Sequence, residues 1–87
     1  MTEDAITKIN HAKTVLEMIA QDLTIPKNIR RAAKNAMDSL ASEKNTAAMR
    51  AYGAIRGLEE VSQDLNCPLH ARTKIWQVVS LLETITD

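Results

Sequence analysis

The sequence is poor in the residues that make turns, disulfides and aromatic stacks. It contains two glycines, two prolines, one cysteine, one tryptophan, one tyrosine and no phenylalanine. So little turn chemistry argues against a protein of many β-strands, and two aromatic side chains offer few surfaces for stacking nucleic-acid bases. A single cysteine cannot form an intramolecular disulfide, which fits a reducing compartment better than a secreted setting.

The sequence also lacks an excess of charge of either sign. Eleven Lys and Arg residues balance eleven Asp and Glu residues. This balance removes the global electrostatic argument for binding nucleic acid or an acidic membrane, so any such role needs a local patch. No apolar run approaches the roughly 18 residues of a membrane span, and the first residues are acidic where a signal peptide is basic. We therefore expect a cytoplasmic protein with no membrane partner.

The length of 87 residues, with 45% hydrophobic content, suits one folded domain over residues 1–87. Within it, residues 15–42 align with residues 57–84 at a shift of 42, and eight of these 28 pairs are identical. Composition alone predicts about two identities, so the sequence indicates an internal repeat with halves of about 1–42 and 43–87. The identical pairs are Leu16/Leu58, Glu17/Glu59, Gln21/Gln63, Asp22/Asp64, Leu23/Leu65, Pro26/Pro68, Arg30/Arg72 and Leu40/Leu82.

Apolar residues recur at three- and four-residue steps in each half, which is typical of amphipathic helices. We expect helices over about 3–22, 26–40, 46–65 and from 68 onward, with Pro26 and Pro68 each opening a helix because proline needs no N–H there. The predicted fold is all-α, a four-helix up-and-down bundle built from two similar helical hairpins. The predicted core positions of the first and third helices are Ile6, Ile9, Leu16, Ile19 and Leu23, and Ala48, Ala51, Ile55, Leu58, Val61 and Leu65.

Two features of the second half need a packing explanation. Gly53 and Gly57 stand inside the third predicted helix, where each costs about 1 kcal/mol relative to alanine, so we expect close approach by the backbone of a neighbouring helix. Seven of the eleven residues from Ile75 to Ile85 are apolar, a wider arc than elsewhere. Either this helix is the most buried one, or part of its surface meets another chain.

Asp22 with Arg30, and Asp64 with Arg72, occur at the same places in both halves. Each acid ends one predicted helix, and each arginine lies in the second turn of the next. We therefore expect a structural clamp across each hairpin turn rather than a catalytic pair.

A cationic stripe on the second predicted helix is the best candidate for a functional surface. It consists of Lys27, Arg30, Arg31 and Lys34, which share one face and could follow a phosphate backbone. The alternative is a solvated face balanced by Glu59, Glu60 and Asp64, and the sequence favours it because no aromatic residue interleaves the bases.

Other reactive side chains give weak signals. Cys67 and His70 have metal-like spacing, but the only further His or Cys is His11, and Cys67 takes the place of the hydrophobic Ile25 in the first half. No phosphate loop, Ser/His/Asp set or paired-carboxylate site is present, so no cofactor, metal or catalytic residue is expected.

Three segments resemble a known family: LTIPKNIRRAA (23–33), PLHARTKIW (68–76) and SLLE (80–83). They are similar to archaeal uncharacterised protein family 0147, whose members are small all-helical proteins. The resemblance implies an up-and-down four-helix bundle in the archaeal cytosol and implies no activity. One departure is the stretch Thr46-Ala47-Ala48, where the family suggests a proline near the start of the third helix.

Two functional hypotheses follow. The first is a non-enzymatic helical interaction or scaffold protein that binds a protein partner or itself through the fourth helix, with Trp76, Val79 and Leu81 as the self-association surface. The alternative is an RNA- or DNA-binding module that uses the basic face of the second helix. The identity of any partner is not encoded in a recognisable motif.

Overall fold

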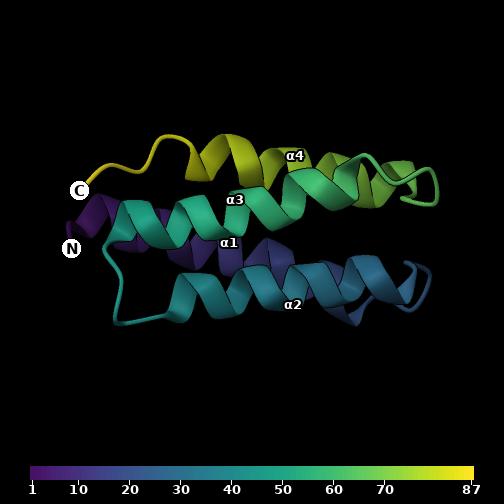
Figure 1. The fold of residues 1–87 in the computed structure, drawn as a ribbon, viewed down its shortest axis with the longest axis horizontal. Helices are drawn as coiled ribbons and strands as arrows, with labels where there is room; N and C mark the ends of the chain where they lie inside the picture. The colour runs from purple at the N-terminus through teal and green to yellow at the C-terminus, as the bar shows by residue number, and fades with distance from the viewer.

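Four α-helices and no strand make up the computed structural model, which describes all 87 residues. The helices are α1 (Glu3–Gln21), α2 (Lys27–Ala41), α3 (Ala47–Ser62) and α4 (Leu69–Leu82). Helices α1 and α3 each pack against both α2 and α4, so successive helices are neighbours and α4 closes back on α1 (Figure 1). The predicted all-α four-helix bundle is confirmed.

Two helices begin at a capping threonine and two begin after a proline. The Thr2 hydroxyl accepts a hydrogen bond from the Ala5 N–H of α1, and the Thr46 hydroxyl accepts one from the Met49 N–H of α3. Pro26 and Pro68 directly precede α2 and α4. Proline restricts its own backbone and has no N–H to satisfy, so both prolines end the preceding turn and start a helix. At the third start, threonine therefore caps the helix in place of the proline suggested by the resemblance.

The helices enclose one core that contains no buried polar or charged residue. Its 21 members are aliphatic side chains and one cysteine, drawn from all four helices and from the turns. The largest fully buried members are Leu16, Ile19, Ile25, Ile29, Leu40, Leu58, Ile75, Leu82 and Val78. Since neither aromatic residue is among them, aliphatic burial supplies the hydrophobic driving force.

Three predicted core residues lie in solvent instead. Leu23 and Leu65 are 83% and 97% exposed because α1 ends at Gln21 and α3 ends at Ser62. Helical periodicity no longer applies in the turns that hold these leucines, and the residues two places later turn inward instead, namely Ile25 and Cys67. Ile6 lies on the flank of α1, since Ala5 and Ile9 occupy the core-facing positions there.

Burial accounts for most of the wide apolar arc of the fourth helix, although Trp76 is exposed and Leu81 is half-buried. Five residues of α4 are buried (Ala71, Ile75, Val78, Val79 and Leu82), and Ile85 beyond its end is buried as well. None of the four helices combines the length and apolar character needed to cross a membrane.

The α1–α2 and α3–α4 turns meet at one end of the bundle, and the two termini lie at the other end beside the α2–α3 connection (Figure 1). At the latter end, Lys8 Nζ lies 3.5 Å from the Thr84 carbonyl oxygen, and Asp87 Oδ1 accepts a hydrogen bond of 3.0 Å from the Ala48 N–H. Both ends of the chain are therefore tied to the same end of the bundle.

The two glycines of α3 have different surroundings. A Cβ added at Gly53 would lie 2.5 Å from Ser39 Oγ of α2, a hydroxyl that donates a 3.0 Å hydrogen bond to the Arg50 carbonyl oxygen. Nothing lies within 4 Å of a Cβ at Gly57. The neighbour at Gly53 is thus a side chain and not the backbone of α2, and Gly57 faces an open groove between α2 and α3, so the expected close backbone approach is wrong at both positions.

Replacing Gly57 by alanine should stabilise the protein by about 0.5–1 kcal/mol, because the new methyl group meets no neighbour and alanine restricts the unfolded chain. Gly53→Ala should be close to neutral, since the same gain is offset by displacing Ser39 Oγ from a hydrogen bond that contributes about 1 kcal/mol. Urea unfolding of the two variants measures the difference. Equal effects at the two positions would contradict this account of the α2–α3 contact.

Candidate functional site

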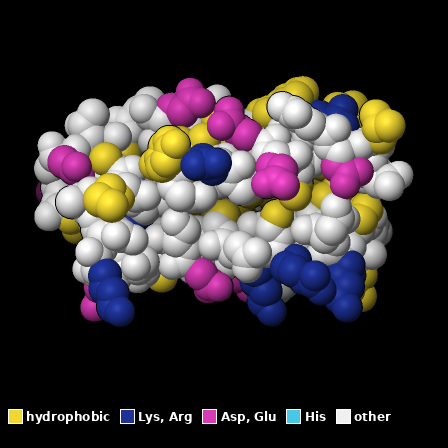
Figure 2. Space-filling model, in the orientation of Figure 1, with side chains coloured by type: hydrophobic (Ala, Val, Ile, Leu, Met, Phe, Trp, Pro, Cys, Tyr) yellow, Lys and Arg dark blue, Asp and Glu magenta, His cyan; other side chains and the backbone are white.

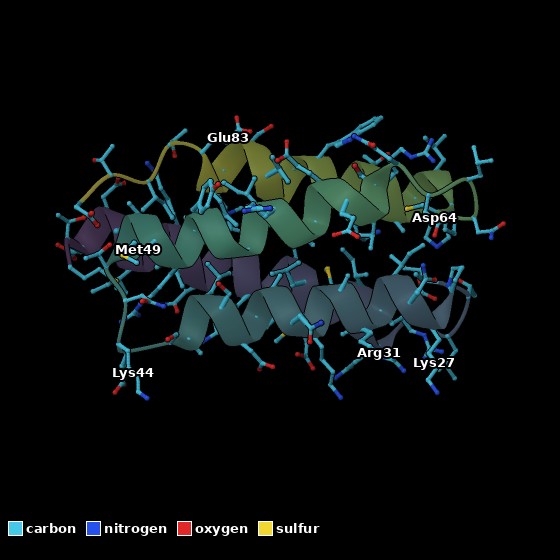
Figure 3. All side chains as sticks on the ribbon, in the orientation of Figure 1. Lys27, Arg31, Lys44, Met49, Asp64 and Glu83 are labelled. Atoms are coloured by element: carbon cyan, nitrogen blue, oxygen red, sulfur yellow. The ribbon has the colours of Figure 1, made fainter.

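The main candidate site is a group of four cations on α2, which we call the basic cluster: Lys27, Arg30, Arg31 and Lys34. Lys27, Arg31 and Lys34 are exposed and Arg30 is half-buried. Figure 2 shows Lys and Arg side chains gathered over the first half of α2. Lys27 and Arg31 project from the helix away from the rest of the bundle (Figure 3). The structure therefore keeps the predicted stripe together on one surface.

The basic cluster surrounds a hollow of about 180 Å³ on the α1–α2 side of the bundle. Its lining consists of the four cations and Ala20 of α1, with no carboxylate. Arg30 is fixed in place because its Nε donates a 2.9 Å hydrogen bond to the Ile25 carbonyl oxygen. The arrangement offers an anion several N–H donors around one small recess.

None of the cluster's cations forms an ion pair. The two ion pairs of the structure join Lys8 to Asp4 and His70 to Asp22. Two of the acids expected to balance the cationic stripe lie elsewhere. Asp64 accepts a hydrogen bond from Asn28, and Glu59 lines a groove between α3 and α4. Only Glu60 borders the same groove as Arg31, and it makes no ion pair with it. The positive charge of the cluster is therefore not neutralised by contact.

The hairpin turns are held by other atoms than the predicted Asp–Arg clamps. Asp22 Oδ1 accepts hydrogen bonds from the Thr24 N–H and hydroxyl, whereas Arg30 binds the Ile25 carbonyl oxygen. In the second turn, Arg72 donates to the backbone carbonyl oxygen of Asp64, and the Asp64 carboxylate accepts from the Asn66 N–H. Each carboxylate stabilises its own turn, because it can reach the N–H of the residue two places later. The predicted Asp–Arg ion pairs are therefore absent.

The two turns are joined to each other by contacts that sequence reasoning missed. Asn28 Nδ2 of α2 donates a 2.9 Å hydrogen bond to Asp64 Oδ2, and His70 Nε2 of α4 lies 3.5 Å from Asp22 Oδ2. Asn28 and His70 are 42 residues apart, as are Asp22 and Asp64. The aspartate of each interhelical turn therefore contacts the first helical turn of the helix that follows the other interhelical turn. The internal-repeat alignment pairs Asn28 with His70 and Asp22 with Asp64, and this pairing was the sequence signal from which the contacts could have been predicted. We call the two contacts the crossed contacts.

The surroundings of Asp22 favour its charged form. Hydrogen bonds from the Thr24 hydroxyl and N–H lower the pKa of Asp22 below its usual 3.8, and nearby His70 and Lys74 act in the same direction, while desolvation opposes the shift. Because the folded-state pKa is lowered, the carboxylate adds stability above its unfolded pKa and this contribution is lost on acidification.

Cys67 and His70 do not form a reactive pair. His70 contacts Asp22 and Thr24, whereas the Cys67 thiol is buried and lies 3.8 Å from the Pro68 carbonyl oxygen. Burial raises the pKa of this thiol above its usual 9.0, although Arg72 nearby opposes the shift. No three His, Cys, Asp or Glu side chains come together in the structure in a way that could hold a metal ion.

The three residues predicted for self-association do not share one surface. Trp76 is 54% exposed and lines a groove of about 600 Å³ between α3 and α4, with Val79 at its base. Leu81 lies on the other flank of α4, in a groove with His11 and Val15 of α1. Val79 is only 8% exposed, so it offers little surface to a second chain. The exposed Leu65, beside Trp76 in the first groove, was missed because it was assigned to the core.

Fold and site together define a class of protein: an all-α bundle with an aliphatic core, whose charged and aromatic side chains lie outside the core. The sequence pattern of the Uncharacterised protein family (UPF0147) matches residues 1–85, and the chain belongs to this family. This confirms the resemblance noted in the sequence.

Its relatives are archaeal proteins of similar length. A UPF0147 protein of Aeropyrum pernix is 51% identical over 80 residues, which cover 92% of this chain and 88% of that protein. A UPF0147 protein of Saccharolobus solfataricus is 47% identical over 87 residues, covering 100% and 98%.

Two crystal structures are similar along almost the whole chain, each with a TM-score of 0.90. One is of a protein of unknown function, 44% identical, covering 92% of this chain and 91% of that chain. The other is from the UPF0147 family in Thermoplasma acidophilum, 28% identical, covering 98% and 100%. They support the fold and carry no functional description.

Replacing Asp22 by asparagine should destabilise the protein at neutral pH and have less effect at about pH 3, because the contribution of the lowered pKa begins to be lost once the pH falls below the usual value of 3.8. Urea unfolding of wild type and variant at both pH values gives the comparison. Asp38→Asn, at an exposed aspartate of α2 outside the crossed contacts, is the control. A wild-type advantage over Asp22→Asn that is the same at both pH values would show that the charge of Asp22 does not stabilise the turn.

Proposed function

We propose that this protein is a non-enzymatic helical interaction module that acts in the cytoplasm and binds the phosphodiester backbone of nucleic acid through the basic cluster. The observation that carries the proposal is the set of four cations around a recess that no carboxylate lines. Cations that make no ion pair within the protein lose no internal contact when they meet a phosphate.

The dimensions of the basic cluster suit a polyanion. Lys27 and Lys34 are seven residues apart, about 10 Å along the helix at a rise of about 1.5 Å per residue. Duplex DNA carries one charge per roughly 1.7 Å of its axis, so about six phosphates lie along that length and four cations can each meet one. The contacts are to the backbone and carry no base readout, so the binding is independent of sequence.

The neutral total charge of the protein is compatible with this role. Opposing charges of a neutral chain can be separated in space, and the Asp22 and Asp64 carboxylates are engaged by the turns rather than by the basic cluster. A local cluster on a neutral protein gives weaker long-range attraction than a basic protein would, so we expect binding to be modest and salt-sensitive.

A non-enzymatic role is supported by the positions of the reactive side chains. The thiol of Cys67 is buried with a raised pKa, and His70 is engaged in a turn contact. General acid–base or nucleophilic catalysis needs such groups together in a recess, within hydrogen-bond reach of each other. The recess of the basic cluster contains cations and one alanine methyl group.

Fluorescence anisotropy with labelled single-stranded RNA and with labelled duplex DNA tests the proposal. Affinity should fall as salt is added, with a logarithmic slope no steeper than about −2.8 for the single strand and about −3.6 for the duplex, because at most four phosphates are neutralised. Arg31→Glu should weaken binding by about tenfold at low salt, since it removes one cation and adds a repulsive charge.

Lys44→Glu is the matched control, because it makes the same change of charge at the opposite end of the bundle (Figure 3). Circular dichroism checks that both variants fold. The proposal fails if neither nucleic acid binds at low salt. It also fails if Lys44→Glu weakens binding as much as Arg31→Glu, because the effect would then come from net charge rather than from the basic cluster.

A further inference from the structure

The solvent-facing side of α3 and α4 contains both aromatic residues of the protein. Trp76 is 54% exposed and Tyr52 is 62% exposed. Tyr52, Arg56 and Glu59 follow one another at helical spacing on α3, and Glu59 lines the same groove as Trp76, Leu65 and Arg72. We call this surface the aromatic face, meaning Tyr52, Arg56, Glu59, Leu65, Arg72 and Trp76.

The folded chain alone does not account for these exposed side chains. The core is filled by aliphatic residues, so Trp76 and Tyr52 add little to the interior that holds the fold together. Exposed tryptophan, tyrosine and arginine side chains are enriched at protein–protein interfaces, where an aromatic ring buries a large area with few rotatable bonds. The guanidinium carbon of Arg56 lies 5.8 Å from the centre of the Tyr52 ring, which holds both side chains against the surface.

The charges of the aromatic face indicate what covers it. Arg56 and Glu59 lie three residues apart on α3 and form no ion pair, whereas the Arg72 guanidinium already donates to the Asp64 carbonyl oxygen. A face with one unengaged arginine and one glutamate is complementary to itself, because a twofold axis brings the cation of one copy to the anion of the other.

The size of this side is also sufficient. A stable interface removes about 800 Å² from each partner, roughly 15% of the 5413 Å² surface of the chain. The bundle measures 35 × 18 × 17 Å, so one of its long sides can supply that area. From these observations we infer that the aromatic face binds a second copy of the same chain to form a twofold-symmetric dimer.

The dimer is independent of the proposed nucleic-acid binding. The basic cluster lies on the α1–α2 side of the bundle, and the aromatic face lies on the α3–α4 side. The four helices follow one another around the bundle, because each of α2 and α4 packs against both α1 and α3. The α1–α2 side is therefore opposite the α3–α4 side, and the two surfaces point in opposite directions. The dimer therefore leaves both basic clusters free.

Sedimentation equilibrium over protein concentrations from about 1 μM to about 1 mM tests the inference. We expect a monomer–dimer equilibrium, and because Trp76 is the sole tryptophan, its emission should shift to the blue as the dimer forms. Trp76→Ala should weaken the dimer by at least about 30-fold, the loss typical of a central interface anchor. Met18→Ala, which removes an equally exposed side chain from α1, should leave the dimer unchanged.

An exchange of charges between two residues distinguishes a specific interface from nonspecific association. Arg56→Glu and Glu59→Arg should each weaken the dimer, and the double variant should recover much of the loss because complementary charges are restored. Circular dichroism checks the fold of each variant. A monomer at every concentration overturns the inference, as does a dimer that Trp76→Ala and Met18→Ala affect equally. Nucleic-acid binding by a strictly monomeric protein would leave the proposed function intact while removing this inference.

Discussion

Burial of an aliphatic core between four helices is the interaction on which the rest of the molecule depends. Leucine, isoleucine, valine and alanine side chains, together with Cys67, fill the interior, in which no polar or charged residue is buried. A core of this kind stabilises the fold without demanding specific hydrogen bonds, and it leaves the charged and aromatic residues on exterior faces. Any recognition by this protein therefore takes place on helix surfaces and at the ends of the bundle, where side chains can differ without disturbing the packing.

Much of the fold could be predicted from the sequence because its determinants are local. The spacing of Leu16 and Ile19 marks a core-facing stripe, and Pro26 and Pro68 mark helix starts whatever their neighbours are. The same rule was wrong for Leu23 and Leu65, since periodicity has meaning only inside a helix and both residues lie just past a helix end. Whether the two halves arose by duplication stays a prediction from the repeat.

The candidate site divides in the same way. The basic cluster could be predicted because four cations on one helix share a face by geometry alone. The crossed contacts could not, because Asn28 meets Asp64 only when two hairpins are packed side by side, and helical spacing does not state which turn faces which. Likewise, the separation of Trp76 from Leu81 depends on which helix lies on each flank of α4, a property of the assembled bundle.

Both chain ends lie at the same end of the bundle as the α2–α3 connection, with Lys8 beside Thr84 (Figure 1). A short link from the C-terminus to the N-terminus, together with a cut in the exposed stretch around Lys44, would change the order of the hairpins without altering any helix contact. Chain order is thus incidental to the packing. The α2–α3 connection serves as a tether that raises the effective concentration of one hairpin near the other. Two separate hairpin peptides would need a correspondingly high concentration in solution to associate.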